Sequence, residues 1–364
     1  MPSLRLSRHS QSVRTVGVMA AVALLCVATP ATAESAELSL PAPTGRDAVG
    51  RTTIVLTDHS RVDPWVPEAG PRRLMVTTYY PAVRGTGGKA RYMDIAEAEA
   101  LMEHAGPSVN LPADKLAGTR TWSRTDALPL SGRRPLVLLS PGFTMPRHTM
   151  TALAEDLASR GYVAAAVDHA YESVATKFPG GVLPCSACEL PGKIGIGKIA
   201  LSRGADLSFV LDQLSRNPLV DRHHIAVVGH SMGGSGAATA MRADRRIDAG
   251  INMDGAMLPS DPLDRPFLLF GSPDLHVPGN EEYDPSWETV WPRMSGWKRW
   301  LTATTGSHYS FTDMTHLLRP ADARDIHMTR SYVAAFVDQH LRGIPQRLLT
   351  GPSADFPEVG FDHP

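Results

Sequence analysis

Short apolar runs alternate along the chain with longer segments whose apolar residues recur every three to four positions. The clearest runs are 135–140, 162–168 and 224–230, each followed by glycine, proline or polar residues. The segments 151–161 and 204–217 between them have helical periodicity. Apolar strands that alternate with helices are typical of α/β proteins with a mainly parallel central sheet and helices on both faces.

The same pattern predicts further elements on either side of this region. Strands are expected at 52–58, 72–82, 247–254, 265–274 and 301–306. Helices are expected at 93–106 and 324–341, and a helix of small residues is expected directly after Ser231, in the stretch that runs to Met241. In mainly parallel sheets, reactive groups gather at the carboxyl ends of the strands. The residues directly after each apolar run are therefore the first candidates for chemistry.

One such residue is a serine between a predicted strand and a predicted helix, in IAVVGHSMGGSGAATAM (225–241). The pentapeptide GHSMG (229–233) fits G-x-S-x-G, in which a sharp turn exposes the serine and excludes bulky flanking side chains. The small residues that follow allow the helix to lie close to the sheet, with its N-terminal dipole directed at the site. Ser231 is the predicted nucleophile, and the arrangement is typical of the α/β-hydrolase fold.

The serine needs a neighbouring base and an acid that orients it. Among 14 histidines, His308 follows the last predicted strand, where this fold delivers its base. His169 could line the site or merely cap its strand, and the side chain of His230 is expected to point away around the turn. Asp254 and Asp274 end the two strands after the serine. The order Ser…Asp…His holds for both, and the pattern slightly favours Asp274.

An oxyanion hole needs two main-chain donors. Met232, directly after the serine, is predicted to supply one. The loop LLSPGFTMPRH (138–148) is predicted to supply the other through Phe143, although its Pro141-Gly142 pair is also compatible with a simple turn.

The N-terminus predicts a secreted protein. Three arginines precede an apolar run at 16–28, and small residues at 31–33 form a signal-peptide cleavage site. The run is shorter than the ~20 residues that a membrane-spanning helix needs. Cleavage near Ala33 would leave Cys185 and Cys188, which predict a local disulfide in an oxidising compartment. The alternatives are a redox Cys-x-x-Cys pair or zinc, for which nearby ligands are too few.

Composition and charge narrow the partners. The formal net charge of −1 gives no electrostatic reason to expect nucleic acid. Without internal repeats or a long linker, one catalytic domain is expected at 51–345. It would follow a signal peptide at 1–33 and a flexible segment at 34–50, and precede a C-terminal tail at 346–364.

With these groups assigned, the chain resembles secreted bacterial members of the plasma-type platelet-activating factor acetylhydrolase family from about Thr52 to Leu341. The resemblance rests on DPWVPEAGPRRLMVTTYYPA, LLSPGFTMPRHT, LASRGYVAAAVDH, VVGHSMGGSGAATAM, INMDGAML and TGSHYSFTDM. It implies Ser231 as nucleophile and His308 as base, and it favours Asp254 over Asp274 as acid.

The resemblance also implies oxyanion donors at Phe143 and Met232. The chain departs from the family pattern where Ser140-Pro141-Gly142 replaces Ser-His-Gly, and where no bulky aromatic residue follows Ser231. Both departures alter the acyl pocket.

The predicted activity is ester hydrolysis by a secreted enzyme through an acyl-enzyme, without a metal or cofactor. The resemblance implies short or oxidised acyl chains on glycerophospholipids. Alternatives are a cutinase-like polyester hydrolase, a general carboxylesterase or lipase, an acyltransferase, and a non-catalytic binding protein on the same scaffold. Four tryptophans (Trp287, Trp291, Trp297 and Trp300) favour packing of a helix on the sheet over a patch that contacts lipid.

Overall fold

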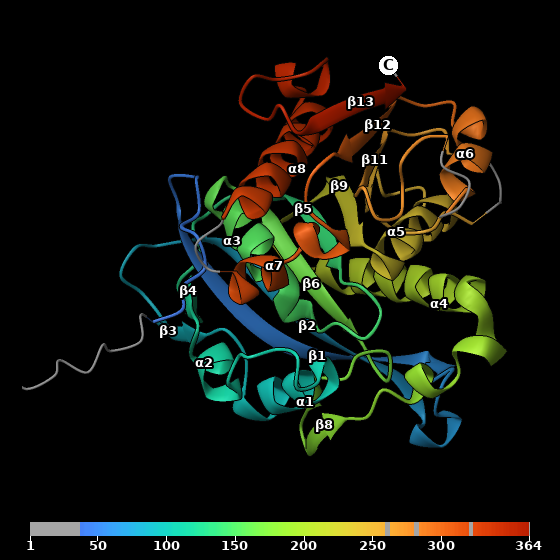
Figure 1. The fold of residues 1–364 in the computed structure, drawn as a ribbon. Coiled ribbons are helices and arrows are strands. Elements are labelled where there is room, and N and C mark those ends of the chain that lie inside the picture. Colours follow the sequence, from blue (N-terminus) through green and yellow to red (C-terminus); the bar gives the residue numbers. More distant parts are fainter. Residues whose placement is uncertain (1–36, 259–262, 280–283, 320–322, 364) are drawn as a thin grey trace, which may run out of the picture. The chain divides into compact units, whose positions relative to one another are not determined.

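An 11-stranded mixed sheet forms the centre of the protein (Figure 1). The computed structural model describes residues 37–258, 263–279, 284–319 and 323–363, without the side chains of 191–194, so the predicted signal peptide lies outside the described residues. The strands follow one another in the order β13 (Val359–His363), β12 (Lys298–Ala303), β11 (Phe267–Gly271), β10 (Ala249–Met253), β9 (Val220–His230), β5 (Arg134–Ser140), β6 (Val163–His169), β2 (Pro71–Ala82), β1 (Ala48–Val62), β4 (Arg120–Thr125) and β3 (Gly88–Arg91).

The central strands β12, β11, β10, β9, β5 and β6 run parallel, as predicted. In the register, Ser140 of β5 lies opposite Gly229 of β9, and Met253 of β10 lies opposite His230. The carboxyl ends of three neighbouring strands therefore meet at the predicted serine turn. Every residue of β6, β10 and β11 is buried, which explains their continuous apolar runs.

Helices cover both faces of the sheet, as predicted (Figure 1). Helices α3 (Thr151–Ser159) and α8 (Arg324–Arg342) pack on one face, and α4 (Pro191–Leu214), α5 (Met232–Ala243) and α6 (Ser286–Val290) on the other. A smaller apolar cluster joins α1 (Ile95–Ala105), α2 (Ala113–Gly118) and α7 (Asp313–Leu318). In the described residues, no helix has both the length and the apolarity needed to cross a membrane.

The domain boundaries differ from the prediction at both ends. The segment 346–364, predicted to be a tail, contributes β13, which pairs antiparallel with β12. In the segment 34–50, predicted to be flexible, Leu40 is 1 % exposed and Arg330 of α8 donates to two main-chain carbonyls. Both segments are short and rich in proline and polar residues, so their few anchoring contacts leave no periodic pattern.

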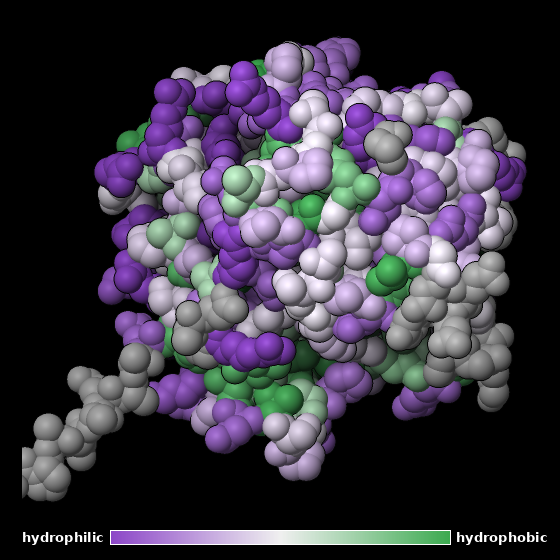
Figure 2. Space-filling model, turned by 45° about the horizontal axis from the view of Figure 1, so that its top comes forward, coloured by the Kyte–Doolittle hydropathy of each residue, from purple (hydrophilic) through white to green (hydrophobic). Residues whose placement is uncertain are grey.

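All four tryptophans contact the apolar core, as the packing interpretation predicts, but only Trp287 does so from an α-helix, α6. Trp287 and Trp300 are 0 % and 2 % exposed, and Trp291 and Trp297 pack at the edge of the two main clusters. The prediction of a helix around Trp300 was wrong, because this residue lies in β12. On the face drawn in Figure 2, polar and charged residues predominate, and hydrophobic residues gather mainly toward its lower edge.

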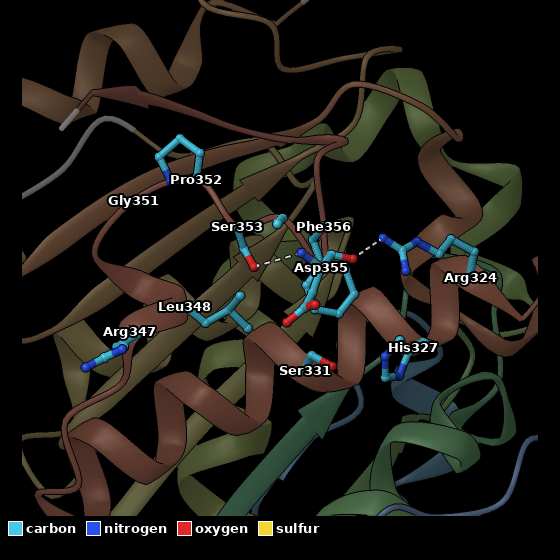
Figure 3. A pocket seen from close by; sticks show the side chains of 11 residues that line it. Arg324, His327, Ser331, Arg347, Leu348, Gly351, Pro352, Ser353, Asp355 and Phe356 are labelled. Carbon is cyan, nitrogen blue, oxygen red and sulfur yellow. Dashed lines mark hydrogen bonds between the residues drawn. The ribbon is translucent and has the colours of Figure 1, made fainter.

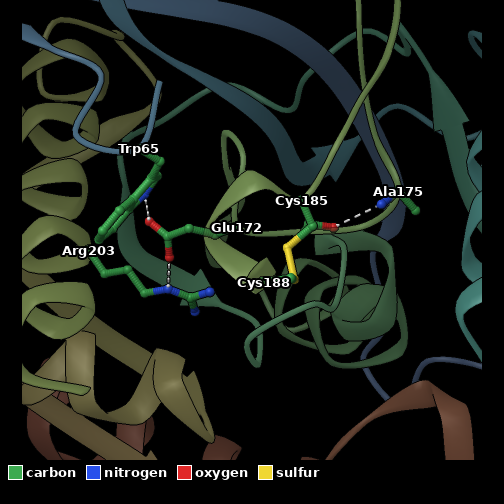
Figure 4. The surroundings of a disulfide bond; sticks show 7 residues. Trp65, Glu172, Ala175, Cys185, Cys188 and Arg203 are labelled. Carbon is green, nitrogen blue, oxygen red and sulfur yellow. Dashed lines mark hydrogen bonds and ion pairs between the residues drawn. A yellow bond between two sulfur atoms is a disulfide. The ribbon is translucent and has the colours of Figure 1, made fainter. Parts of the chain in front are cut away.

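Between β6 and α4, the chain forms a two-stranded hairpin, β7 (Thr176–Phe178) and β8 (Gly181–Leu183). A disulfide then joins Cys185 and Cys188, as predicted, with Cα atoms 5.3 Å apart (Figure 4). Ala187, between the two cysteines, is buried and donates its N–H to the carbonyl of Tyr171. The disulfide thus fixes a turn that packs back onto Tyr171, at the start of the connection between β6 and α4.

Replacing both cysteines with serine is expected to lower the free energy of unfolding by about 2 kcal/mol, because so short a loop restricts the unfolded chain only modestly. The melting temperature should then fall by about 3 °C. Thermal unfolding of the wild type with and without reductant is the matched measurement. A variant as stable as the oxidised wild type would contradict the prediction.

Asp313, the first residue of α7, is 2 % exposed and accepts hydrogen bonds from the Ala152 N–H at 3.1 Å and the Tyr92 hydroxyl at 3.3 Å. Burial raises the pKa of Asp313 to about 8. Between pH ~4 and ~8, the folded chain keeps a proton that the unfolded chain loses, so stability falls as the pH rises, by up to about 1.4 kcal/mol per pH unit. Asp313→Asn should flatten this slope in urea unfolding at pH 5, 6 and 7; an unchanged slope would contradict it.

Candidate active site

Ser231 occupies the sharp turn between β9 and α5. Its backbone has φ 54° and ψ −125°, a conformation that non-glycine residues seldom adopt and that often marks functional sites. The Ser231 N–H donates to the carbonyl of Met253 at 2.7 Å, which ties the turn to the end of β10. Ser231 is half-buried, so it is not closed off in the core.

Two glycines of the G-x-S-x-G pattern are required by close approach. A Cβ at Gly229 would lie 2.0 Å from the carbonyl oxygen of Gly233, and a Cβ at Gly233 would lie 1.9 Å from the carbonyl oxygen of Ser140. These contacts are too short for any side chain. The pattern therefore reflects the packing of the turn against itself and against the end of β5.

His308 begins a short 3-10 turn (His308–Phe311) after β12 and is held at three points. Its Nδ1 lies 2.6 Å from Asp254 Oδ2. Its main-chain N–H donates to Asp274 Oδ2 at 2.9 Å, and its carbonyl accepts from His230 Nε2 at 2.8 Å. Contacts on the ring and on both main-chain groups fix the direction of the imidazole.

Asp254 follows β10 in the left-handed conformation (φ 58°), which aspartate tolerates better than most residues. The side chain of Asn252 closes this turn by bonding both the N–H and the carbonyl of Gly255. Burial by itself raises the pKa of Asp254, but hydrogen bonds from His276, His308 and Ser272 outweigh it and hold the pKa below its ordinary value. The carboxylate is therefore ionised when it meets the His308 ring.

The two carboxylates that the sequence left open both contact His308, in different ways. Asp254 bonds the imidazole ring, whereas Asp274 bonds the main chain. Only a ring contact can select the tautomer and stabilise an imidazolium. The geometry therefore favours Asp254 as the acid and gives Asp274 a supporting contact.

His230 differs from the expectation that its side chain points away. Its ring centroid lies 4.6 Å from that of His308, and its Nε2 donates to the His308 carbonyl. Burial, together with the nearby His308, lowers the pKa of His230 to about 3, so the ring is neutral. The G-x-S-x-G pattern describes only the backbone around the serine and carries no information about this side chain.

The loop after β5 lies beside the serine. A Cβ at Gly142 would be 3.4 Å from the Cβ of Ser231, so Phe143 follows directly at the site. In the described parts of the chain, neither the Phe143 N–H nor the Met232 N–H is bonded to a protein acceptor. Both side chains pack against one apolar cluster, which contains Trp65, Met75, Ala170, Tyr171, Phe178, Ala187 and Ile199.

Two buried charged residues, Arg203 and Glu172, hold the loop after β5 through hydrogen bonds to its main chain. Arg203 donates to the carbonyl of Pro141, and Thr144 donates its N–H to the carbonyl of Glu172 at 2.9 Å. Glu172 in turn accepts from Arg203 Nε at 2.7 Å and from the Trp65 indole at 2.8 Å (Figure 4). Because both charged side chains are buried and paired, they hold the loop rigidly.

A second Ser–His–Asp arrangement lies deeper in the core. Ser140 Oγ is 2.9 Å from His169 Nε2, and His169 Nδ1 is 2.8 Å from Asp206 Oδ2. These three residues are at most 2 % exposed, so no substrate reaches the hydroxyl. Of the two roles that the sequence allowed for His169, the structural one is observed.

A pocket of about 730 Å³ lies elsewhere, between α8 and the segment 347–356 (Figure 3). Its lining includes Arg324, His327 and Asp355, whereas Ser231 and His308 are absent from it. This hollow is thus separate from the serine turn.

Comparison with known proteins agrees with this fold. A solved structure described as ferulic acid esterase from Streptomyces cinnamoneus is 41% identical and superposes with a TM-score of 0.81, covering 90% of this chain and 100% of that one. A protein of Arthroderma benhamiae named probable 1-alkyl-2-acetylglycerophosphocholine esterase is 29% identical, over 88% of this chain and 93% of its own. The platelet-activating factor acetylhydrolase of the dog, Canis lupus familiaris, is 26% identical over 50% of this chain and 48% of its own.

Fold and site thus define a carboxylic ester hydrolase of the α/β-hydrolase fold. The sequence profile of the family described as platelet-activating factor acetylhydrolase, isoform II, matches residues 110–179 and 192–318. The chain belongs to this family, and the resemblance noted in the sequence is confirmed. A non-catalytic role on the same scaffold is not supported.

Proposed function

We propose that Ser231, His308 and Asp254 form the catalytic triad of this ester hydrolase. The observation that carries the proposal is the 2.6 Å contact between His308 Nδ1 and Asp254 Oδ2. It makes Nδ1 the protonated nitrogen and leaves Nε2 as the proton acceptor. The strained turn at Ser231 and its position at the end of β9 support the role of nucleophile.

In the proposed reaction, His308 Nε2 takes the hydroxyl proton as Ser231 Oγ attacks the ester carbonyl. The main-chain N–H groups of Phe143 and Met232 stabilise the oxyanion. His308 then donates the proton to the leaving alcohol, and an acyl-enzyme forms. Water deprotonated by the same nitrogen attacks the acyl carbon, and the acid and the free serine are released.

The substrates are proposed to be small esters with short acyl groups, including short-acyl glycerophospholipids. The names of the fungal and dog relatives support this class. Hydroxycinnamate esters are the second candidate, favoured by the 41% identity to the ferulic acid esterase. The aromatic cluster that packs against Phe143 and Met232 also supports an aromatic acyl group. For glycerophospholipid substrates, we also propose that the protein makes peripheral contact with a lipid surface.

A rate panel separates these classes. It compares acetyl, butyryl and palmitoyl nitrophenyl esters, a short-chain phosphatidylcholine, methyl ferulate and a polyester film. Acetyl and butyryl esters should be hydrolysed faster than palmitoyl, and the ratio of phosphatidylcholine to ferulate decides between the candidates. Polyester as the best substrate would favour the cutinase-like alternative, and ester product after addition of an alcohol would reveal acyl transfer.

We also propose that the protein is secreted after cleavage near Ala33. The apolar run at 16–28 and the Cys185–Cys188 disulfide support export to an oxidising compartment. N-terminal sequencing of protein recovered from the culture medium tests this. A mature N-terminus at Glu34 is expected, and retention of the intact chain inside the cell would contradict it.

A further inference from the structure

A second histidine contacts the carboxylate of Asp254. His276, which follows β11 and is 2 % exposed, places its Nδ1 2.8 Å from Asp254 Oδ1. The Ser272 N–H also donates to Oδ1 at 2.7 Å, and the Ser272 hydroxyl donates to Oδ2 at 2.6 Å. With His308 on Oδ2, each carboxylate oxygen therefore has two donors.

The ring of His276 is itself fixed. The indole of Trp287 stacks on it with centroids 3.9 Å apart and an interplanar angle of 19°. Trp287 is held by a 2.7 Å bond from its indole N–H to the Gly255 carbonyl. On the far side of the ring, Nε2 lies 3.4 Å from Asp284 Oδ2, at ion-pair distance but without an aligned hydrogen bond.

We propose that His276 is a positioning residue for the triad: it holds Asp254 by Oδ1 so that Oδ2 faces His308, and it shares the negative charge of that carboxylate. The result is a chain of contacts, Asp284–His276–Asp254–His308, in which the two middle residues are buried and the two outer ones are half-buried. The inference rests on the proposed function, because it assumes that His308 is the catalytic base.

The charges around His276 support the claim that it shares the negative charge of Asp254. Asp254 and Asp284 face the His276 ring from neighbouring elements. Trp287, which stacks on the ring, is neutral. Asp274, on the same loop as His276, bonds the main chain of His308 instead. Burial lowers the pKa of His276, but the two carboxylates outweigh burial and raise it above its ordinary value. A positive His276 offsets part of the charge that Asp254 presents to His308. This offset should let catalysis continue to lower pH.

Two substitutions separate the parts of the proposal. His276→Phe keeps a ring against Trp287 but removes the hydrogen-bond donor to Asp254. We expect kcat to fall about 10–100-fold, the loss that is typical when a residue that orients a functional side chain is removed, while KM stays within about twofold. His276→Gln keeps a neutral donor and should recover part of this loss. In both variants, the acidic limb of the kcat/KM profile should move up by about 0.5–1 pH unit, because Asp254 is no longer offset.

Asp284→Asn is a test that leaves the His276 ring in place. Because Asp284 favours the positive form of His276, this substitution should move the acidic limb of the kcat/KM profile in the same direction, but by less. His327→Gln, an exposed histidine on α8, is the matched control and should change neither kcat nor the profile. Melting temperatures verify that each variant is folded, and Asp284→Asn decides if the His276 variants do not fold.

The outcomes distinguish this inference from the proposed function. If a fluorophosphonate labels Ser231 in the wild type, yet folded His276 variants or Asp284→Asn keep the wild-type kcat and pH profile, the inference about His276 is overturned and the triad stands. If Ser231 is not labelled while the enzyme is active, the proposed function fails and this inference fails with it.

Discussion

Replacing Ser231 with alanine is expected to lower kcat by about 10⁶-fold, leaving only the slow rate that substrate binding and the oxyanion donors support. The reason is that, in the proposed triad, the Ser231 hydroxyl is the group that attacks the ester carbonyl and forms the acyl-enzyme. The measurement is steady-state hydrolysis of nitrophenyl acetate by purified enzyme. KM, where it can still be measured, should change little, because the hydroxyl contributes mainly to the chemical step.

Ser331→Ala, on α8 and away from the site, is the matched control and should retain wild-type kcat. Both variants should fold, because alanine removes one oxygen from each site. A Ser231→Ala enzyme that keeps even a tenth of the wild-type rate would mean that another residue attacks the ester.

The second large effect is expected from Asp254→Asn, which should lower kcat by about 10⁴-fold, since an amide favours the wrong imidazole tautomer. The substitution leaves a side chain of the same size in the turn after β10. The measurement is kcat on the same ester, together with the melting temperature to exclude unfolding.

Asp274→Asn is the informative comparison. Its amide oxygen can still accept from the His308 N–H, so kcat should fall by less than about tenfold, as for a single neutral hydrogen bond. If only Asp274→Asn abolished turnover, the assignment of Asp254 as the acid would be wrong.

Much of the fold follows from the sequence because its elements are locally determined. The parallel strands β5 and β6, and the second half of β9 from Ile225 onward, are mainly apolar runs, and such runs are buried on both faces. The serine turn was predictable for a different reason, since only glycine fits at positions 229 and 233, two residues before and two residues after Ser231. The ends of the domain were not predictable: β13 is held by pairing with β12, a contact between segments more than 50 residues apart.

The candidate site likewise contains residues that the sequence predicts and residues that it does not. Ser231 and His308 follow from their places at strand ends, whereas the choice between Asp254 and Asp274 depends on how two loops fold toward one imidazole. The roles of His230 and His276 are also invisible in the sequence, because no spacing rule connects them to His308 or Asp254. Their burial and their partners become apparent only when β9, β10, β11 and the loop after β12 are brought together.

The most direct test of the central claim is labelling of the active enzyme with a fluorophosphonate, followed by peptide mass spectrometry. The account predicts one adduct per chain, on Ser231, formed in parallel with loss of esterase activity and strongly slowed in Asp254→Asn. Complete inactivation with the adduct on a different residue, or full activity after Ser231 is labelled, would contradict it.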